Sequence, residues 1–253
     1  MMKYPIIEFD STREAFIEPS KVVEPRDIPK HCVICFFKEV IDKVVKEHGA
    51  KILYENNWED GPHHLYEIEY KGQRLAFFHP GVGAPVSAGL LEEVIALGGK
   101  KFIAGGGCGV LEQDIAVGNL IVVSSAIRDE GTSYHYLPPG REVTAQIEVV
   151  QTIENTLQSQ NIPYRVGKTW TTDAPYRETP IKIEQRRMEG CLVVEMEASA
   201  MIAVSQFRGV AFGQILYGGD SLGGETWDNR NWQSRTDIRE NLFWLCADVC
   251  LSL

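Results

Sequence analysis

Two glutamates follow a short apolar run in the second half of the chain, and their placement suggests a binding site. Leu192-Val193-Val194 leads directly into Glu195-Met196-Glu197, and small residues follow from Ala198. The run predicts a buried strand whose carboxyl end meets the start of a helix. Carboxylates are seldom buried without partners, so a strand end with two of them indicates a site for a polar ligand.

Sugar hydroxyls are the ligand that such a pair of carboxylates suits. A carboxylate accepts two hydroxyl donors side by side, and the thioether of Met196 can lie against a sugar ring. The alternative is that Glu195 and Glu197 only place negative charge at the start of the following helix, which is common at helix N-termini. Spacing alone does not choose between the two interpretations.

A third acidic residue occupies a similar position further along the chain. Gly218-Gly219-Asp220-Ser221 follows the apolar run 210–217, which predicts another buried strand. In an α/β sheet, ligands gather at the carboxyl ends of the strands, so Asp220 is expected in the same crevice as Glu197. A structural alternative is an Asp turn closed on Ser221.

The elements that must position these residues alternate along the chain. Apolar strands and amphipathic helices predict one three-layer α/β/α domain over residues 31–253, with a mixed, mostly parallel sheet, after a proline-interrupted N-terminal arm at 1–30. Glycine turns are expected at 81–83 and 105–109. The expected strands are 52–54, 75–79, 102–104, 120–124, 192–196 and 210–217. The expected helices are 38–48, 86–97, 144–160, 181–188, 198–207 and 237–251.

Net charge and apolar content bear on the partners of the protein. Its 25 Lys and Arg residues against 35 Asp and Glu residues give a formal charge of −10, and the field of such a protein repels nucleic acid and anionic membranes. No stretch approaches the roughly 18 apolar residues of a membrane span, and the first ten residues lack a signal-peptide core. A cytoplasmic location is therefore expected.

The six cysteines are expected to be ordinary buried thiols. Cys32 and Cys35 have the spacing of a metal-binding pair, but they fall in an apolar run that predicts a strand. Cys246 and Cys250 lie on one face of an expected helix and do not complete a second pair. Neither a metal ion nor an organic cofactor is expected.

The segment 194–200, Val-Glu-Met-Glu-Ala-Ser-Ala, resembles the signature of the nucleoside phosphorylase superfamily, which includes uridine and purine nucleoside phosphorylases and related nucleosidases. The resemblance runs from about Lys30 to the C-terminus. Other segments that follow in the family's order are Gly81–Pro85, Leu91–Gly98, Gly105–Gly109, Asp114–Leu120 and Arg128–Ser133. It implies an enzyme that cleaves the N-glycosidic bond of a nucleoside, and an assembly that is a homodimer or a hexamer of dimers.

The resemblance also implies roles for individual residues. Glu195, Met196 and Glu197 would bind the ribose. Asp220 would protonate the leaving base, because a base leaves more easily when neutral and a dry site raises a carboxyl pKa toward neutrality. The residues implied in base binding are Thr172, Asp173, Tyr176 and Gly219, and those implied around the nucleophile are Gly83, Gly106, Gly107 and Cys108.

Base preference stays open at this stage. The short distance from Asp173 to Glu195 resembles the purine branch, and the segment 171–178 lacks the Gln-x-Arg pair with which uridine phosphorylases read uracil. Tyr176 has a ring that can stack on a base, although a tyrosine beside a proline is more often plain packing. Arg230 and Arg235 are candidates to orient Asp220.

The chain departs from the family where phosphorylases bind phosphate. No Gly-Asp-Pro-x-Arg turn occurs at 34–40, Ala104 and Gly107 stand where an arginine and a threonine are expected, and 61–66 lacks the arginine lent to the neighbouring subunit. Losing two or three charge-assisted hydrogen bonds, each worth about 1.5–3 kcal/mol, removes roughly 3–9 kcal/mol of phosphate binding. The candidate replacements are Lys38, Arg26, Arg128 and the backbone amides of the glycine run.

Three functional hypotheses follow. The leading one is phosphorolysis to free base and ribose 1-phosphate, with inorganic phosphate as co-substrate, if a replacement cation exists. The second is hydrolysis by water, as in the nucleosidases. The third is a nucleoside-binding protein that has lost catalysis, which ranks last because Glu197 and Asp220 are both retained.

Overall fold

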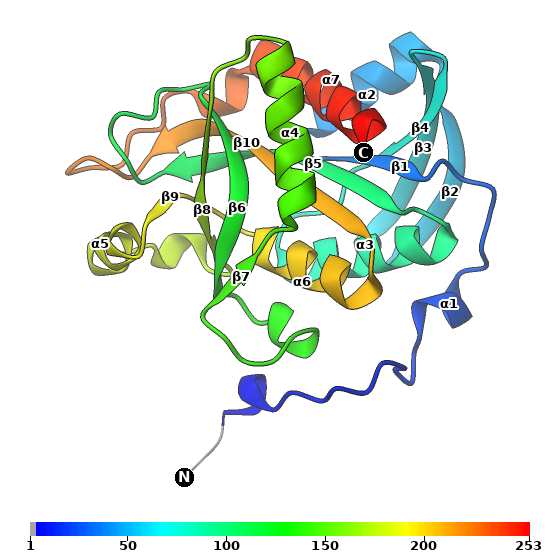
Figure 1. Cartoon of the computed structure of the whole chain (residues 1–253), viewed down its shortest axis with the longest axis horizontal. Coiled ribbons are helices and arrows are strands. Elements are labelled where there is room, and N and C mark those ends of the chain that lie inside the picture. The colour runs from blue at the N-terminus through cyan, green and yellow to red at the C-terminus, as the bar shows by residue number, and fades with distance from the viewer. Residues whose placement is uncertain (1–3) are drawn as a thin grey trace.

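A mixed sheet forms the centre of the structure, a computed structural model that describes residues 4–253 (Figure 1). Within these residues the strand order is β10-β6-β8-β9-β5-β1-β4-β3-β2, and β7 pairs with β6. The strands are β1 (His31–Cys35), β2 (Lys51–Trp58), β3 (Gly61–Tyr70), β4 (Gln73–Phe78), β5 (Lys101–Val110), β6 (Leu120–Asp129), β7 (Glu142–Thr144), β8 (Tyr164–Thr172), β9 (Cys191–Glu195) and β10 (Ala211–Ser221).

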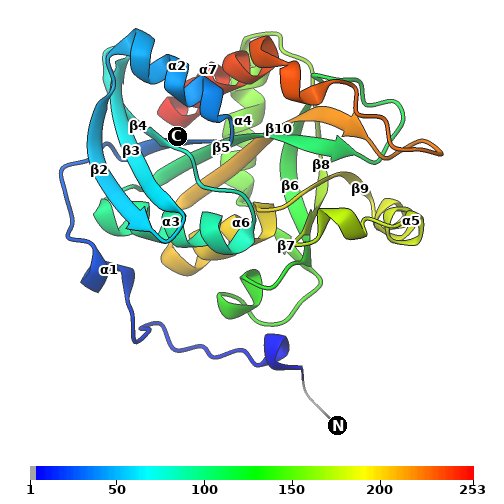
Figure 2. The same ribbon diagram turned by 180° about the vertical axis from the view of Figure 1, so that it is seen from behind.

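Helices cover both faces of this sheet (Figures 1 and 2). α7 packs on β5 and β1, and α4 packs on β6 and β10. α6 packs against β10 and β6 on the other face, with α3 beside it. The main helices are α2 (Lys38–His48), α3 (Ala84–Leu97), α4 (Ile147–Ser159), α5 (Pro180–Met188), α6 (Ala198–Arg208) and α7 (Thr236–Ser252). The α/β fold with one large mixed sheet is thus confirmed.

Antiparallel pairing is more frequent than the sequence suggested. Parallel and antiparallel pairings are equally common among the strands of residues 4–253. The meander β2–β3–β4 accounts for two antiparallel pairings, and a two-residue turn at Lys71 and Gly72, both with positive φ, joins β3 to β4. Tight turns of this kind connect antiparallel neighbours without a crossover helix. β3, β7 and β8 were not expected from the sequence.

Five strands close into a ring that shapes the candidate site. β10 pairs with β5 in parallel and with β6 antiparallel, and β6, β8 and β9 pair in parallel. A short antiparallel contact completes the ring, with Val194 opposite Gly109 and Val193 opposite Val110. Because β9 runs against β5, the chain that leaves β9 runs back along the glycine-rich part of β5.

That glycine-rich part is strand, which corrects the expected turn at 105–109. Gly105–Gly109 lie within β5, and none of them has a positive φ. A Cβ added at Gly105 would lie 2.9 Å from Cys246 Sγ, and one added at Gly109 would lie 2.6 Å from Leu222 Cδ1. Glycine is needed here because neighbouring side chains approach the strand closely. Gly218 and Gly219 likewise belong to β10 and do not form a turn after it.

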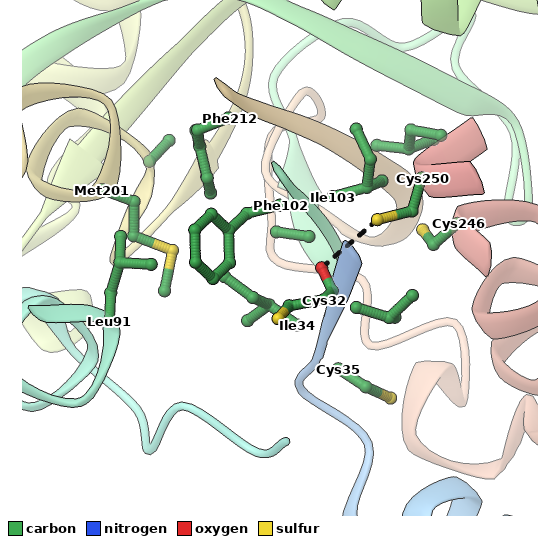
Figure 3. Close-up of a cluster of buried hydrophobic side chains, with 14 of the residues drawn as sticks. Cys32, Ile34, Cys35, Leu91, Phe102, Ile103, Met201, Phe212, Cys246 and Cys250 are labelled. Atoms are coloured by element: carbon green, nitrogen blue, oxygen red, sulfur yellow. Dashed lines mark hydrogen bonds between the residues drawn. The ribbon is translucent and has the colours of Figure 1, made fainter. Parts of the chain in front are cut away.

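The core lies on both sides of β1 and β5 (Figure 3). Leu91 of α3 and Met201 of α6 pack on one side. Cys246 and Cys250 of α7 pack on the other, where the Cys250 thiol lies 3.6 Å from the carbonyl oxygen of Cys32. All six cysteines are free and buried.

The described residues contain neither a cluster of metal-ligating side chains nor a membrane-spanning helix. Over residues 4–253, no three or more His, Cys, Asp or Glu side chains gather in a way that could hold a metal ion. In the same residues, no helix has both the length and the apolar content needed to cross a membrane.

The N-terminal segment runs outside the α/β layers and alongside α3 and α6 (Figure 2). Between residues 4 and 30 it contains only the short helical turns Pro5–Ile7 and Pro19–Val22. Arg208 of α6 holds it through an ion pair with Glu18 of 2.5 Å. The expected arm extends to residues 1–3, which lie outside the described residues, and its boundary at residue 30 stays a prediction.

Candidate active site

A cavity of about 580 Å³ opens where β5, β9 and β10 meet the start of α6. Its wall combines apolar, acidic and amide side chains with the glycine stretch of β5. The lining residues from the first half of the chain are Phe36, Phe37, Val82 and 106–109. Those from the second half are Pro175, Glu178, 194–197, Gln214, Leu216, Asp220, Leu222, Trp232, Gln233 and Arg239.

Glu197 lines this cavity directly before α6, next to the turn that precedes α3. Gly81 and Gly83, in the turn that begins α3, have φ values of +74° and +94°, which favour glycine. The turn directs the N–H of Gly83 at Glu197 Oε1, 2.6 Å away. Burial, together with the nearby Glu195 carboxyl, raises the pKa of Glu197 to about 8.

Glu195 also lines the cavity, but protein donors already engage both of its oxygens. Its Oε1 accepts hydrogen bonds from the hydroxyls of Thr169 and Thr171, at 3.2 and 2.6 Å. Its Oε2 accepts from the N–H groups of Glu197 and Ala198, at 2.7 and 2.6 Å. Glu195 therefore places its negative charge at the start of α6, which was the alternative interpretation of its position in the sequence. These contacts favour a structural role over the predicted ribose contact.

Asp220 faces the cavity from the end of β10. Its Oδ2 accepts a hydrogen bond of 2.7 Å from Trp227 Nε1. The alternative of an Asp turn is not what the structure shows, because the N–H of Ser221 donates to the carbonyl of Asp228. Arg230 and Arg235 donate to backbone carbonyls and do not contact Asp220. Trp227 therefore orients this carboxyl.

A further acid in the cavity was missed by the sequence analysis. Glu178 lies between a short helical turn and the start of α5, and it lines the cavity together with Asp220. Burial, reinforced by the charge of Asp220, raises the pKa of Glu178 to about 7. A glutamate before a helix looks ordinary in sequence, so no local signal could have identified it.

None of the four predicted base contacts lies in the cavity wall, and three of them lie at the end of β8 or in the segment after it. Thr172 ends β8, and its hydroxyl accepts from the N–H of Ala174. Asp173 accepts from the N–H of Gly131 at 2.8 Å, and the side chain of Tyr176 is 98% exposed. Pro175 and Glu178 of the same segment do line the cavity, and the roles predicted for Thr172, Asp173 and Tyr176 stay predictions.

The remaining predicted residues lie at or beside the cavity. Gly106, Gly107 and Cys108 line it. Gly83 donates a hydrogen bond to Glu197, which lines it, and Gly219 directly precedes Asp220 in β10. The Cys108 thiol lies 3.2 Å from the carbonyl oxygen of Tyr217, and burial holds the pKa of this thiol well above its usual value. A neutral, buried thiol does not act as a nucleophile.

Arg239 of α7 is the one cation in the cavity wall among residues 4–253. It donates to the Tyr217 hydroxyl at 3.1 Å and to the Glu39 carboxylate at 2.6 Å. Its guanidinium also lies over the rings of Phe37 and Trp232, 4.9 and 5.4 Å from their centroids. Its charge is therefore already paired.

None of the three replacement cations expected from the sequence reaches the cavity wall. Lys38 pairs with Asp42 on the exposed face of α2. Arg26 donates to the carbonyl oxygen of Leu53. Arg128 is buried elsewhere, and its guanidinium donates to the hydroxyl of Ser133 and to two backbone carbonyls.

Comparison with known proteins confirms the family. A sequence model of the phosphorylase superfamily matches residues 30–242, so the chain belongs to that superfamily. The chain is 25% identical to guanosine phosphorylase of Halorubrum lacusprofundi over 198 residues, which are 78% of this chain and 81% of the relative. It is 27% identical to purine nucleoside phosphorylase of Plasmodium falciparum over 177 residues, 69% of this chain and 70% of the relative.

Solved structures share the same fold. Uridine phosphorylase from Vibrio fischeri superposes with a TM-score of 0.74 at 24% identity, over 89% of this chain and 91% of that one. AMP nucleosidase from Bacteroides thetaiotaomicron superposes with a TM-score of 0.70 at 20% identity, over 88% of this chain and 87% of that one. At these identities the likeness concerns the fold alone. Because the chain belongs to the phosphorylase superfamily and its sequence relatives are nucleoside phosphorylases, it is an enzyme of the pentosyltransferase or related N-glycosidase type.

Proposed function

We propose that the protein hydrolyses the N-glycosidic bond of a nucleoside, releasing the free base and ribose. The observation that carries this proposal is the excess of carboxyl groups over cations in the cavity wall. Four carboxyl groups line it, against one arginine whose charge is paired with Glu39. The four carboxyl groups are those of Glu178, Glu195, Glu197 and Asp220.

The residues of the cavity suit each part of this reaction. Glu197 binds the ribose hydroxyls, and Met196 packs against the sugar. As the bond between the anomeric carbon and the base breaks, its electron pair stays on the base, which takes a proton from Asp220. The oxygen of water forms the new bond to the anomeric carbon, and the proton that water loses restores Asp220 through solvent.

Water suits this cavity better than phosphate does. Phosphate is an anion at neutral pH, and carboxyl groups in the cavity wall repel it wherever they are ionised, unless cations compensate. Arg239 already donates to the Tyr217 hydroxyl and the Glu39 carboxylate, so binding phosphate would require it to exchange partners. A neutral nucleophile carries no such cost, and the reaction needs neither a metal nor an organic cofactor.

Phosphorolysis, the leading hypothesis from the sequence, is the second candidate. The position of Arg239 in the cavity wall favours it, because a change of partner would turn its guanidinium toward an anion. The names of the relatives, guanosine phosphorylase and purine nucleoside phosphorylase, favour it as well. They also make a purine nucleoside the first substrate to test.

Product analysis tests the proposal. The purified protein is incubated with guanosine, adenosine, inosine and uridine, with and without 10 mM phosphate, after removal of phosphate by dialysis. We expect base release without phosphate, and free ribose as the sugar product under both conditions. Strict dependence on phosphate with ribose 1-phosphate as product would establish phosphorolysis instead. Tight nucleoside binding without turnover would establish a binding protein.

A further inference from the structure

One polar side chain in the cavity has no partner in the protein. Gln214 of β10 is only 1% exposed and lines the cavity, yet neither its Oε1 nor its Nε2 forms a hydrogen bond within residues 4–253. Buried amides nearly always have a partner, because an unpaired one loses its hydrogen bonds to water without replacement. The unpaired amide therefore indicates that a polar group enters this part of the cavity.

Gln214 and Asp220 are the first and last residues of β10 in the cavity wall. They are six positions apart, and the register of β10 with β5 shifts between Gly218 and Ser221. Gln214 stands beside Ala104 of β5, and Leu216 stands beside Gly106, so the amide lies where β5 offers only a methyl group and glycines. A Cβ added at Gly106 would lie 3.1 Å from Phe36 and 3.4 Å from Leu216, so the neighbours here are apolar and offer the amide no hydrogen bond.

This position matches the place of the nucleophile in the reaction. If Asp220 protonates the base, the base occupies the Asp220 end of the cavity and the ribose lies against Glu197. The attacking oxygen approaches the anomeric carbon from the side opposite the departing base, because the bond that breaks occupies the other side. That side corresponds to the end of the cavity where Gln214 lies.

We infer that Gln214 binds the water that attacks the anomeric carbon, an inference that rests on the hydrolytic function proposed above. The amide oxygen accepts a hydrogen bond from this water, which leaves a lone pair of the water oxygen free to face the sugar. The amide also has N–H donors, so the preference for a neutral nucleophile rests on the carboxyl groups that line the cavity and not on Gln214.

The test uses Gln214→Leu and Gln214→Met, which keep approximately the volume of the side chain and remove its polar atoms. Ser87→Ala is the matched control. The Ser87 hydroxyl is another buried polar group without a partner, but it lies in α3 and does not line the cavity. The assays measure kcat and KM for base release, the ratio of methyl riboside to ribose formed in 10% methanol, and Tm.

We expect both Gln214 variants to lower kcat by about 10- to 100-fold and to leave KM within about twofold. The ratio of methyl riboside to ribose rises at least about threefold, because the apolar side chain no longer selects water over methanol; a purely structural role would not move this ratio. Tm stays equal or rises, since no protein partner is lost. Ser87→Ala leaves kcat and the product ratio unchanged.

Several results would overturn the inference. An unchanged kcat and product ratio would show that the amide does not touch the nucleophile. A higher KM at unchanged kcat would place the amide against the nucleoside. A Tm lower by more than about 5 °C would mean that the amide has a protein partner after all. Wild-type protein that forms only ribose 1-phosphate would refute the hydrolytic function as well, whereas hydrolysis that is unaffected in the variants would refute this inference alone.

Discussion

The backbone N–H of Gly83 donates a 2.6 Å hydrogen bond to the carboxylate of Glu197, 114 positions further along the chain. This bond joins the start of α3 to the start of α6 beside the cavity. It holds the Glu197 carboxylate in place before any ligand arrives. A preorganised acceptor of this kind loses little conformational entropy when a sugar binds.

Replacing Glu197 by glutamine should reduce kcat/KM for nucleosides by about 100-fold or more. The amide still accepts from Gly83, but at pH 9, above the raised pKa of Glu197, it lacks the charge that strengthens two hydrogen bonds to ribose hydroxyls, each worth about 1.5–3 kcal/mol when charged. Steady-state kinetics and calorimetric titration with the nucleoside measure the effect. Glu184→Gln, on the exposed face of α5, is the control. Equal affinity in wild type and Glu197→Gln would exclude a ribose contact.

The stability of the protein should fall as pH rises from about 5 to 9. The pKa of Glu197 is raised to about 8 and that of Glu178 to about 7, so the folded state holds these protons more tightly than the unfolded state does. Their contribution is fully present below the unfolded pKa near 4.5 and is lost as pH passes through the folded values. For Glu197 the loss is at most about 5 kcal/mol.

The Glu197→Gln variant isolates the contribution of this residue to the pH effect. Tm measured by calorimetry at several pH values should decline less steeply in the variant, so that the variant gains stability relative to the wild type as pH rises from about 5 to 8. Parallel Tm curves for the two proteins would show that Glu197 has an ordinary pKa.

Replacing Glu195 by alanine should destabilise the fold by about 2–4 kcal/mol, because four protein donors lose their acceptor. Thr171→Val removes one of these donors and should cost about 1–2 kcal/mol. Urea denaturation measures both losses. A Glu195→Ala variant of normal stability that no longer binds nucleoside would instead assign Glu195 to the ribose.

Replacing Asp220 by asparagine should lower kcat by about 100- to 10,000-fold for nucleosides, since the departing base loses its proton donor. The variant should retain activity on 4-nitrophenyl riboside, whose leaving group needs no proton. Trp227→Phe, which removes the 2.7 Å hydrogen bond to Asp220, should cost at most about tenfold. Equal losses on both substrates would show that Asp220 is not the acid.

Replacing Glu39 by glutamine should increase any use of phosphate. The change removes the charge that pairs with Arg239, so the guanidinium is free to bind an anion in the cavity. We expect a phosphate-dependent component of base release to appear or to grow by about tenfold, measured as ribose 1-phosphate. Asp42→Asn, a second acid on α2 that pairs with Lys38, is the control. No response to phosphate in either variant would mean that Arg239 cannot serve as the missing cation.

Much of this protein could be read from its sequence. Each helix expected from the apolar periodicity is present, because local spacing alone decides which face of a helix is buried. The motif around Glu197 and the segment around Asp220 pointed to one cavity, and both residues line it. Motifs of adjacent residues are visible in sequence because a strand end and a helix start lie next to each other in the chain.

Only the tertiary structure decided how the individual side chains are used. Glu195 and Glu197 look equivalent in sequence, yet one is saturated by protein donors and the other faces the cavity. The roles of Glu178, Gln214 and Arg239 depend on partners or on a cavity formed by distant segments, and the closure of β10 onto β5 brings these segments together. Hydrogen-bond saturation and burial are properties of such long-range contacts, so no local pattern of residue types encodes them.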